Sequence, residues 1–380
     1  MKFSIEREAF VHAVQHVDKA ISSRTTIPIL TGIKLEAADD GLFLTGSDSD
    51  VSIEAFIPQA DEEKEYISLK EPGSVVLQAK FFVDIIKKLP GATIEIEVQD
   101  QFAATVRSDS VVFNLNGLDP EEYPRLPKLT EEQTFTLPQH LLKDMIRQTS
   151  FAVSTQETRP VLTGVNFSID GQTLTCTATD SHRLAMRTAQ VEASETPLQI
   201  SNVVIPGKGL NELNKILEDS EETIDVVITE TQVLFKFKNL LFFSRLLDGK
   251  YPVTDNMIPT QSKTSFSIQT KELLQSLERA LLLSKEAKNN VINVKAEGNN
   301  LIEVSSVSAE VGKVQENVNV EGFEGEELRI SFNGKNIMDA LRVIDSETIH
   351  IQFTGAMSPF VVRPTDHEQM LHLFSPVRTY

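Results

Sequence analysis

The chain has 380 residues, 40% of them hydrophobic, and this length predicts two or three domains instead of a single core. It has no run of about 18 apolar residues and begins with the charged "MKFSIEREAF", so we expect neither a transmembrane helix nor a secretion signal. A net charge of −19 argues against nucleic-acid binding by the surface as a whole, because a phosphate-binding surface needs lysine and arginine.

An internal repeat divides the chain into three units of about 130 residues. The "IPILTG" that begins at Ile27 returns as "RPVLTG" from Arg159. The early "FSIEREAF" has counterparts in "FTLPQHLL" and "FSIQTKELL". Polar stretches near each junction place the predicted domains at residues 1–129, 130–260 and 261–380.

Each unit is predicted to contain a strand, a helix and alternating strands, followed by a second copy of this pattern. The expected first-half helices span residues 7–21, 139–151 and 271–284, and the expected second-half helices span 80–88, 208–217 and 335–343. Asp-Gly pairs in "AADDGLFLTG" and "SIDGQTLTCTA" are typical of hairpin turns. The predicted fold class is therefore α+β, with two helices and two small antiparallel sheets in each unit.

The second-half helices carry cations seven residues apart, which is two helical turns on one face. These pairs are Lys80 and Lys87, Lys208 and Lys215, and Lys335 and Arg342. The six predicted helices are together net positive, whereas the rest of the chain is strongly acidic. Two interpretations stay open: ordinary solvated helix faces, or helices that face a polyanion while the sheets face outward. Twelve such helices would close a hole of about 35–40 Å, wide enough for duplex DNA, so two copies head to tail could form a ring.

Two similar stretches raise a question about the middle unit. "TGSDSDVSIEA" from Thr45 and "TATDSHRLAMR", which ends at Arg187, share an acidic turn. The first copy has Asp-Val where the second has His182 and Arg183, so the backbone of the turn does not require His-Arg.

An enzyme is the main alternative. Asp180 with His182, or Asp48 with Asp50, could be metal-ligand pairs, but no third ligand cluster appears and the other histidines are scattered. No glycine-rich phosphate loop or Ser-His-Asp order is evident, so we expect no catalytic site, no metal and no cofactor. A structural scaffold that binds no nucleic acid is a second alternative, although it would not need cationic helices. The lone Cys176 is expected to be a small buried hydrophobe in a protein of the reducing cytoplasm.

The stretches "MKFSIERE", "SSRTTIPILTG", "ATDSHRLA", "RLLDGKYP" and "PVRTY" resemble the bacterial sliding clamps, the β subunits of DNA polymerase III, in their low-GC Gram-positive form. The resemblance runs along the whole chain. It implies three domains of the DNA-clamp fold, which form half of a six-domain homodimeric ring around duplex DNA of any sequence. It also implies a cytoplasmic processivity factor in DNA replication, without membrane contact. Its implied partners are the α subunit of the replicative polymerase, the clamp-loader complex, and other proteins with a clamp-binding peptide of the type Gln-Leu-x-Leu-Phe.

The resemblance also implies three sets of site residues. The partner-peptide pocket would contain Leu162, Thr179, His182, Arg183, Leu184, Pro252, Met257, Met357, Pro359 and Ser375. DNA contacts would add Arg24, Gln156, Pro160 and Val161 to the helix cations, but better-known relatives carry aromatic residues where Pro160 and Val161 stand, so base stacking is not expected there. The dimer interface would join Arg107, Phe113 and Leu115 of the first domain to Leu282 and Leu283 of the third.

Overall fold

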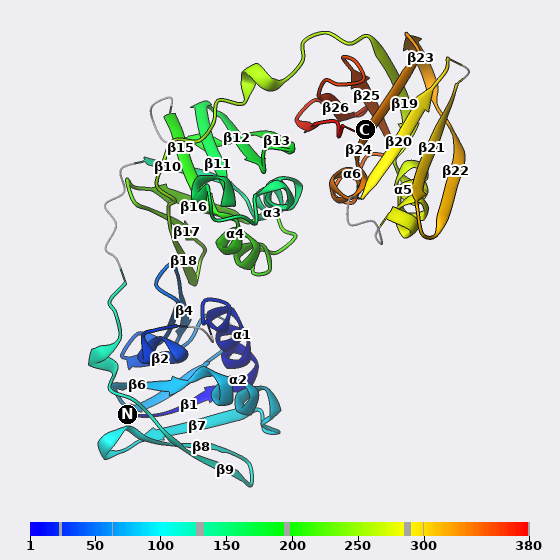
Figure 1. Cartoon of the computed structure of the whole chain (residues 1–380). Helices are drawn as coiled ribbons and strands as arrows, with labels where there is room; N and C mark the ends of the chain where they lie inside the picture. Colours follow the sequence, from blue (N-terminus) through cyan, green and yellow to red (C-terminus); the bar gives the residue numbers. More distant parts are fainter. Residues whose placement is uncertain are drawn as a thin grey trace. The chain divides into compact units, whose positions relative to one another are not determined.

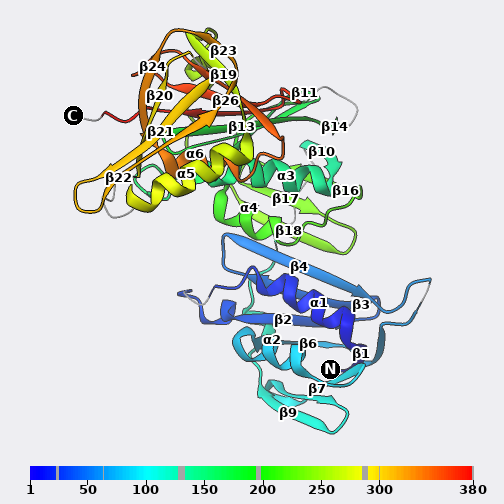
Figure 2. The same cartoon turned by 90° about the vertical axis from the view of Figure 1, so that its right-hand side faces the viewer.

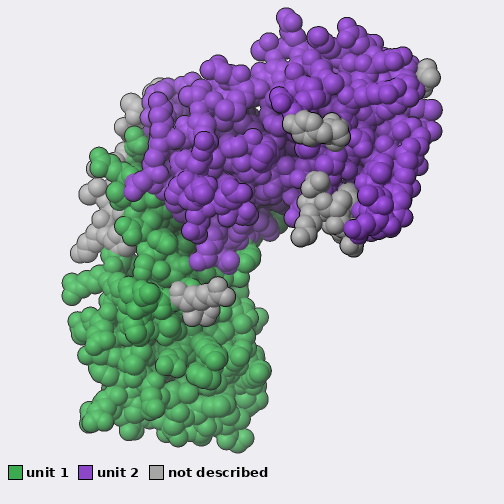
Figure 3. Space-filling view, in the orientation of Figure 1, with its two compact units in different colours: residues 1–139, 215–246 green, residues 140–214, 247–380 purple. Residues whose placement is uncertain are grey.

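The computed structural model of the chain describes residues 1–22, 25–62, 64–126, 133–193, 198–284, 290–298 and 300–378 (Figure 1). These residues form two compact units, one of 1–139 with 215–246 and the other of 140–214 with 247–380 (Figure 3). Both units contain part of the middle repeat. The domain boundaries after residues 129 and 260 therefore stay a prediction.

The described residues form six α-helices, two in each repeat. They are α1 (Arg7–Asp18), α2 (Ala79–Lys88), α3 (Gln139–Thr149), α4 (Gly207–Asn214), α5 (Thr270–Ser284) and α6 (Gly334–Leu341). Several helices end earlier than predicted. Lys215 follows the last residue of α4, and Arg342 is the C-cap of α6, where its N–H still bonds to the Met338 carbonyl. After α3 the chain tightens into a 3-10 turn, η4 (Ser150–Ala152).

Unit 1 contains two antiparallel sheets. The smaller has the order β5 (Ile67–Glu71), β1 (Lys2–Glu6), β7 (Thr93–Val98), β8 (Ala103–Ser108), β9 (Val111–Asn116). The larger includes, in order, β10 (Gln133–Pro138), β16 (Thr223–Ile228), β17 (Gln232–Lys236), β18 (Leu240–Arg245), β4 (Val51–Pro58), β3 (Gly41–Ser47), β2 (Gly32–Ala38) and β6 (Gly73–Gln78).

Unit 2 also contains two antiparallel sheets. The larger has the order β15 (Leu198–Pro206), β11 (Gly164–Gly171), β12 (Thr173–Thr179), β13 (Arg183–Gln190), β27 (Met370–Phe374), β26 (Phe360–Pro364), β25 (Thr348–Phe353), β19 (Thr264–Gln269), β23 (Glu321–Gly325). The smaller has the order β22 (Gly312–Asn319), β21 (Leu301–Ser308), β20 (Val291–Ala296), β24 (Leu328–Asn333).

Strand pairing joins each repeat to the next. In unit 1, β4 of the first repeat pairs with β18 of the second, and in unit 2, β13 of the second repeat pairs with β27 of the third. β9 and β22 each lie at the end of a sheet, with one edge unpaired within the described part of the chain. The same type of joint between repeats thus occurs twice within the chain. β9 in the first repeat and β22 in the third are the corresponding strands that have no partner from another repeat among the described residues.

Alternating burial positions the helices over the sheets. β4 buries every second side chain, and α1 packs across β3 and β4 (Figure 2). The rings of Phe10 on α1 and Phe82 on α2 meet edge to face, with centroids 5.9 Å apart. In the third repeat, α5 packs on β20, β21 and β22. No helix in the described ranges is both long and apolar enough for a membrane span.

Neighbouring phenylalanines on α2 provide a matched test of this packing. Phe82 is fully buried, whereas Phe81 is 54% exposed. We expect Phe82→Ala to lower the free energy of unfolding by about 3–5 kcal/mol, because it leaves a cavity against Phe10. Phe81→Ala should change it by about 0.5 kcal/mol or less. Thermal and urea unfolding of both variants checks this, and equal losses would contradict the packing.

Candidate functional site

The two acidic turns noticed in the sequence have the same backbone structure. In each, Oδ1 of the aspartate, Asp48 or Asp180, accepts hydrogen bonds of 2.8 to 3.1 Å from the N–H groups two and three residues later. The intervening serines, Ser49 and Ser181, have φ of 82° and 77°. Each turn leads into the strand that pairs with the next repeat. The turn is therefore a shared structural element.

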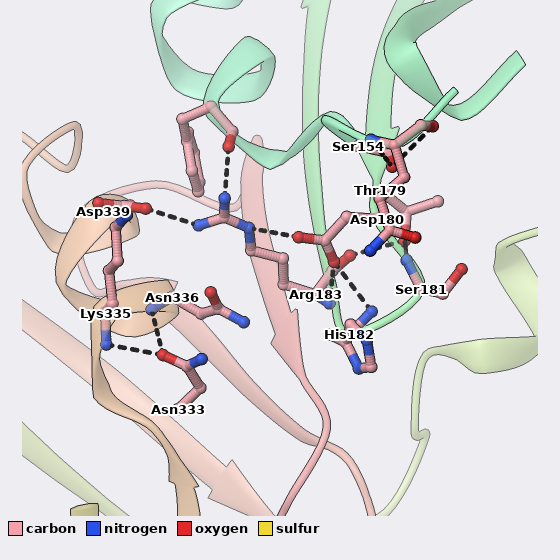
Figure 4. Close-up of polar contacts among 12 residues, drawn as sticks. Ser154, Thr179, Asp180, Ser181, His182, Arg183, Asn333, Lys335, Asn336 and Asp339 are labelled. Carbon is pink, nitrogen blue, oxygen red and sulfur yellow. Dashed lines mark hydrogen bonds and ion pairs between the residues drawn. The ribbon is translucent and has the colours of Figure 1, made fainter. Parts of the chain in front are cut away.

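The residue that leaves the turn distinguishes the two copies. Val51 is buried, whereas Arg183 extends its guanidinium into a polar network (Figure 4). Its Nε donates to Asp180 at 3.0 Å, Nη1 to Asp339 of α6 at 2.9 Å, and Nη2 to the Phe151 carbonyl at 2.7 Å. The guanidinium also lies over the Phe151 ring, 5.2 Å from its centroid. Arg183 thereby connects β13, η4 and α6.

This network gives Arg183 a positioning role. Its side chain is only 11% exposed, and two carboxylates share its charge, so it offers little to an incoming anion. Figure 4 shows the His182 imidazole away from Asp339. His182 is exposed, and its backbone carbonyl accepts a 2.9 Å hydrogen bond from Ser375 N–H.

Three neighbouring strand ends bring predicted pocket residues together. Arg183 pairs with Phe374 of β27, and Phe374 pairs with Phe360 of β26. His182, Ser375 and Pro359, each one position outside these pairs, therefore lie at one edge of the sheet. Thr179 stabilises this edge, because its Oγ1 donates to the Arg183 carbonyl at 2.6 Å and its N–H donates to the Tyr251 hydroxyl at 3.0 Å.

The predicted apolar residues fall into buried and exposed groups. Leu162 and Leu184 are 3% and 2% exposed and belong to separate core clusters, so neither offers its side chain to a peptide at the surface. Met257 and Met357 are 47% and 57% exposed, and Pro252 is half-buried. Val253 is not among the predicted pocket residues, but its 60% exposure beside Pro252 makes it a further candidate. No periodic pattern marks a single valine in a loop, so no signal in the sequence indicates it.

A buried histidine also lies under this edge. His372 of β27 is fully buried, and its ring centroid is 5.5 Å from that of Phe151. Neither ring nitrogen has a hydrogen-bond partner among the described residues. Burial, with the nearby Arg183 charge, lowers the pKa of His372 to about 3. The side chain is therefore a neutral packing residue at physiological pH.

The predicted DNA-facing cations are exposed, but they are not equally available. Lys80, Lys87, Lys208, Lys215, Lys335 and Arg342 all lie on the surface. Arg342 forms a 3.0 Å ion pair with Glu278 of α5. Two other helix arginines, Arg147 and Arg279, also pair with carboxylates. Lys80, Lys87 and Lys335 are thus better candidates for phosphate contact than these arginines. Gln156 is exposed, and Arg24 lies outside the described residues.

The predicted interface residues include exposed apolar side chains. Phe113 of β9 is 38% exposed and Leu282 of α5 is 66% exposed, while Leu115 and Leu283 are half-buried. Arg107 of β8 forms a 3.1 Å ion pair with Glu97. Val112, 53% exposed on β9, is a further candidate that the sequence prediction did not include.

The described ranges contain no group of three His, Cys, Asp or Glu side chains arranged to hold a metal ion. Cys176 is fully buried, and burial raises the pKa of its thiol.

Comparisons with known proteins agree along the whole chain. Family models of the DNA polymerase III β subunit match residues 1–127 (N-terminal domain), 136–253 (central domain) and 255–378 (C-terminal domain). A β sliding clamp of Halalkalibacterium halodurans is 67% identical over 380 residues, covering 100% of both chains. The crystal structure of a Bacillus subtilis sliding clamp superposes with a TM-score of 0.96 at 56% identity, and a Streptococcus pneumoniae β chain with 0.94 at 36%, each covering 100% of both chains.

His372 predicts a particular dependence of stability on pH. Its pKa is about 3 in the folded chain, against an ordinary value of 6.5, so the unfolded chain binds the additional proton as the pH falls below 6.5. At pH 5 this histidine should cost about 2 kcal/mol of unfolding free energy relative to pH 8. His372→Leu should reduce the loss between pH 8 and pH 5 by that amount. Urea unfolding at the two pH values measures this, and equal losses in the wild type and in His372→Leu would contradict the assignment.

Proposed function

The chain belongs to the family of bacterial β sliding clamps, the β subunits of DNA polymerase III, and from this premise we propose how its surfaces are used. It is a processivity factor of DNA replication and is a non-catalytic subunit. We propose that two copies form a head-to-tail ring around duplex DNA in the cytoplasm. In this proposal, partner proteins bind by a short peptide at the neighbouring ends of β13, β26 and β27, around His182.

The pattern of strand joints supports the ring. β4 with β18 and β13 with β27 form two joints within the chain. In the third repeat, β22 occupies the position that β4 and β13 occupy in the first and second repeats. By repetition, the third joint would pair β22 with β9 of another copy. Both strands have an unpaired edge in the described part of the chain, and such edges readily pair with another strand. Exposed Phe113 and Leu282, with Leu115, Leu283 and Arg107 beside them, would be covered at this joint.

The helix lysines support sequence-independent DNA contact. Lys80, Lys87 and Lys335 are exposed, in a chain whose net charge is −19. Lysine contacts to phosphate carry no sequence information, and few of them give weak, salt-sensitive binding. We propose Lys208, Lys215, Arg342 and Gln156 as further DNA contacts; Arg24, which the family resemblance implies, lies outside the described residues. The ion pair with Glu278 makes Arg342 the weaker contributor.

The strand edge at His182 supports peptide binding. Met257, Met357 and Val253 expose apolar side chains, which we assign to this pocket, while the hydrogen bonds of Thr179 and Arg183 hold the strand ends in place. Flexible thioethers suit a site that accepts several partners, such as the polymerase α subunit and the clamp loader. Two large peptide side chains would together contribute about 3–6 kcal/mol before ordering costs. The micromolar affinity that we propose corresponds to about 8 kcal/mol, so the other peptide contacts must supply the difference.

The ring predicts retention that depends on DNA topology. Loaded protein should stay on nicked circular DNA and slide off the same DNA after linearisation, whereas a groove binder would not distinguish them. Lys80→Glu/Lys87→Glu/Lys335→Glu should reduce retention on circles severalfold at low salt. Lys70→Glu/Lys238→Glu/Lys263→Glu makes the same charge change at exposed sheet and loop positions and should retain the wild-type behaviour. If both triple variants lost retention equally, the proposal that the helix lysines contact DNA would be wrong.

Peptide affinity tests the pocket separately. A synthetic Gln-Leu-x-Leu-Phe peptide should bind the wild-type chain with micromolar affinity in isothermal titration. Met357→Asp should weaken binding at least tenfold, because it places a charge on the exposed apolar wall. Lys335→Glu, on helix α6, should bind like the wild type. Unchanged binding in both variants would place the pocket elsewhere.

A further inference from the structure

A groove of about 520 Å³ lies on the third repeat, next to Met357. Its floor is the outward face of the sheet formed by β21, β20 and β24, whose inward face packs against α5. The terminal segment bounds it, where the Val377 N–H bonds to the Ser331 carbonyl at 2.7 Å and Arg378 is exposed. Within unit 2, this groove therefore adjoins the loop that carries Met357 and Pro359.

The floor of the groove places like charges beside each other. Lys295 of β20 and Arg329 of β24 are direct partners across the antiparallel ladder, and Arg378 also lines the groove. Like charges at directly opposite positions destabilise a sheet, and Lys295 is offset by Glu303, its direct partner on β21, whereas Arg329 is not. Lys295 pairs with Glu297, but Arg329 and Arg378 form no ion pair or hydrogen bond with any residue that the structure describes. Glu303 is the one carboxylate among the lining residues.

This excess of cations contrasts with the chain as a whole, which carries a net charge of −19. The two arginines and the lysine of the lining offer charged donors to carboxylates. An extended acidic segment fits such a surface better than an apolar peptide does. Met357 belongs both to the groove lining and to the proposed peptide pocket, so one ligand can continue from one site into the other.

We propose that this groove binds acidic residues that flank the clamp-binding peptide of partner proteins, so that Arg329, Lys295 and Arg378 select partners by charge. The inference rests on the proposed peptide pocket and adds a second determinant to it. Exposed ion pairs contribute modestly to binding free energy and are screened by salt. The groove would therefore adjust the relative affinities of partners that already carry the apolar motif.

Three synthetic peptides test this inference by isothermal titration against the full chain: the Gln-Leu-x-Leu-Phe motif alone, and the motif with four glutamates before or after it. We expect one extended peptide to bind about 3–10-fold more tightly than the motif at 50 mM salt, and this gain to vanish at 500 mM. Lys295→Ser/Arg329→Ser should abolish the gain without changing the affinity of the unextended motif. The matched control is Lys263→Ser/Lys271→Ser, which removes two exposed cations of the same repeat outside the groove and should keep the gain.

The outcomes separate this inference from the proposed function. If the unextended motif does not bind the wild-type chain, the pocket and this inference both fail. If the motif binds but neither extension improves its affinity, or if the control loses the gain equally, the inference alone is wrong. If Lys295→Ser/Arg329→Ser lowers retention on circular DNA but leaves the peptide gain intact, the groove contacts nucleic acid and the inference is again overturned.

Discussion

Unpaired strand edges constrain this structure more than any other feature. A strand that ends a sheet leaves backbone N–H and C=O groups that favour pairing with another strand. β4 and β13 have partners in the following repeat, so two such edges are satisfied within the chain. β22 and β9 are left at the two ends of the series, with one edge open in the described residues. In the proposed assembly a second copy satisfies both, and the ring follows from the same joint used again.

The acidic turn shows how one element acquires a new role without changing its backbone. Asp48 and Asp180 bond to their turns alike, and both turns lead into a joining strand. Replacing an apolar residue by Arg183 adds contacts to Asp339 and to the Phe151 carbonyl. These contacts fix the ends of the strands at which the proposed pocket lies. The guanidinium of Arg183 already bonds to groups of this chain, so it is not available to a partner. Selection among partners would therefore depend on surrounding side chains, including the cations of the neighbouring groove.

The sequence predicted the large-scale organisation well, because repeats and hydrophobic periodicity are local signals. The three repeats, the six helices and the α+β class are confirmed by the structure and the family matches. Long-range partners were not predictable in this way. Nothing in the sequence indicates that Arg183 reaches Asp339, that Arg342 pairs with Glu278, or that Lys295 and Arg329 lie opposite each other. These depend on strand register and helix placement, which no motif encodes.

Hydrogen–deuterium exchange of the wild-type chain tests the central claim most directly, because it reads the backbone pairing itself. At concentrations where sedimentation shows a dimer, the amides of β9 and β22 that point to the open sheet edge should be protected together, and we expect the amides of β4 and β13 to be protected as well. Dilution to the monomer should release these outward amides of β9 and β22 at once and leave β4 and β13 protected. Rapid exchange of the outward amides in the dimer, or their protection after dilution to the monomer, would contradict the account.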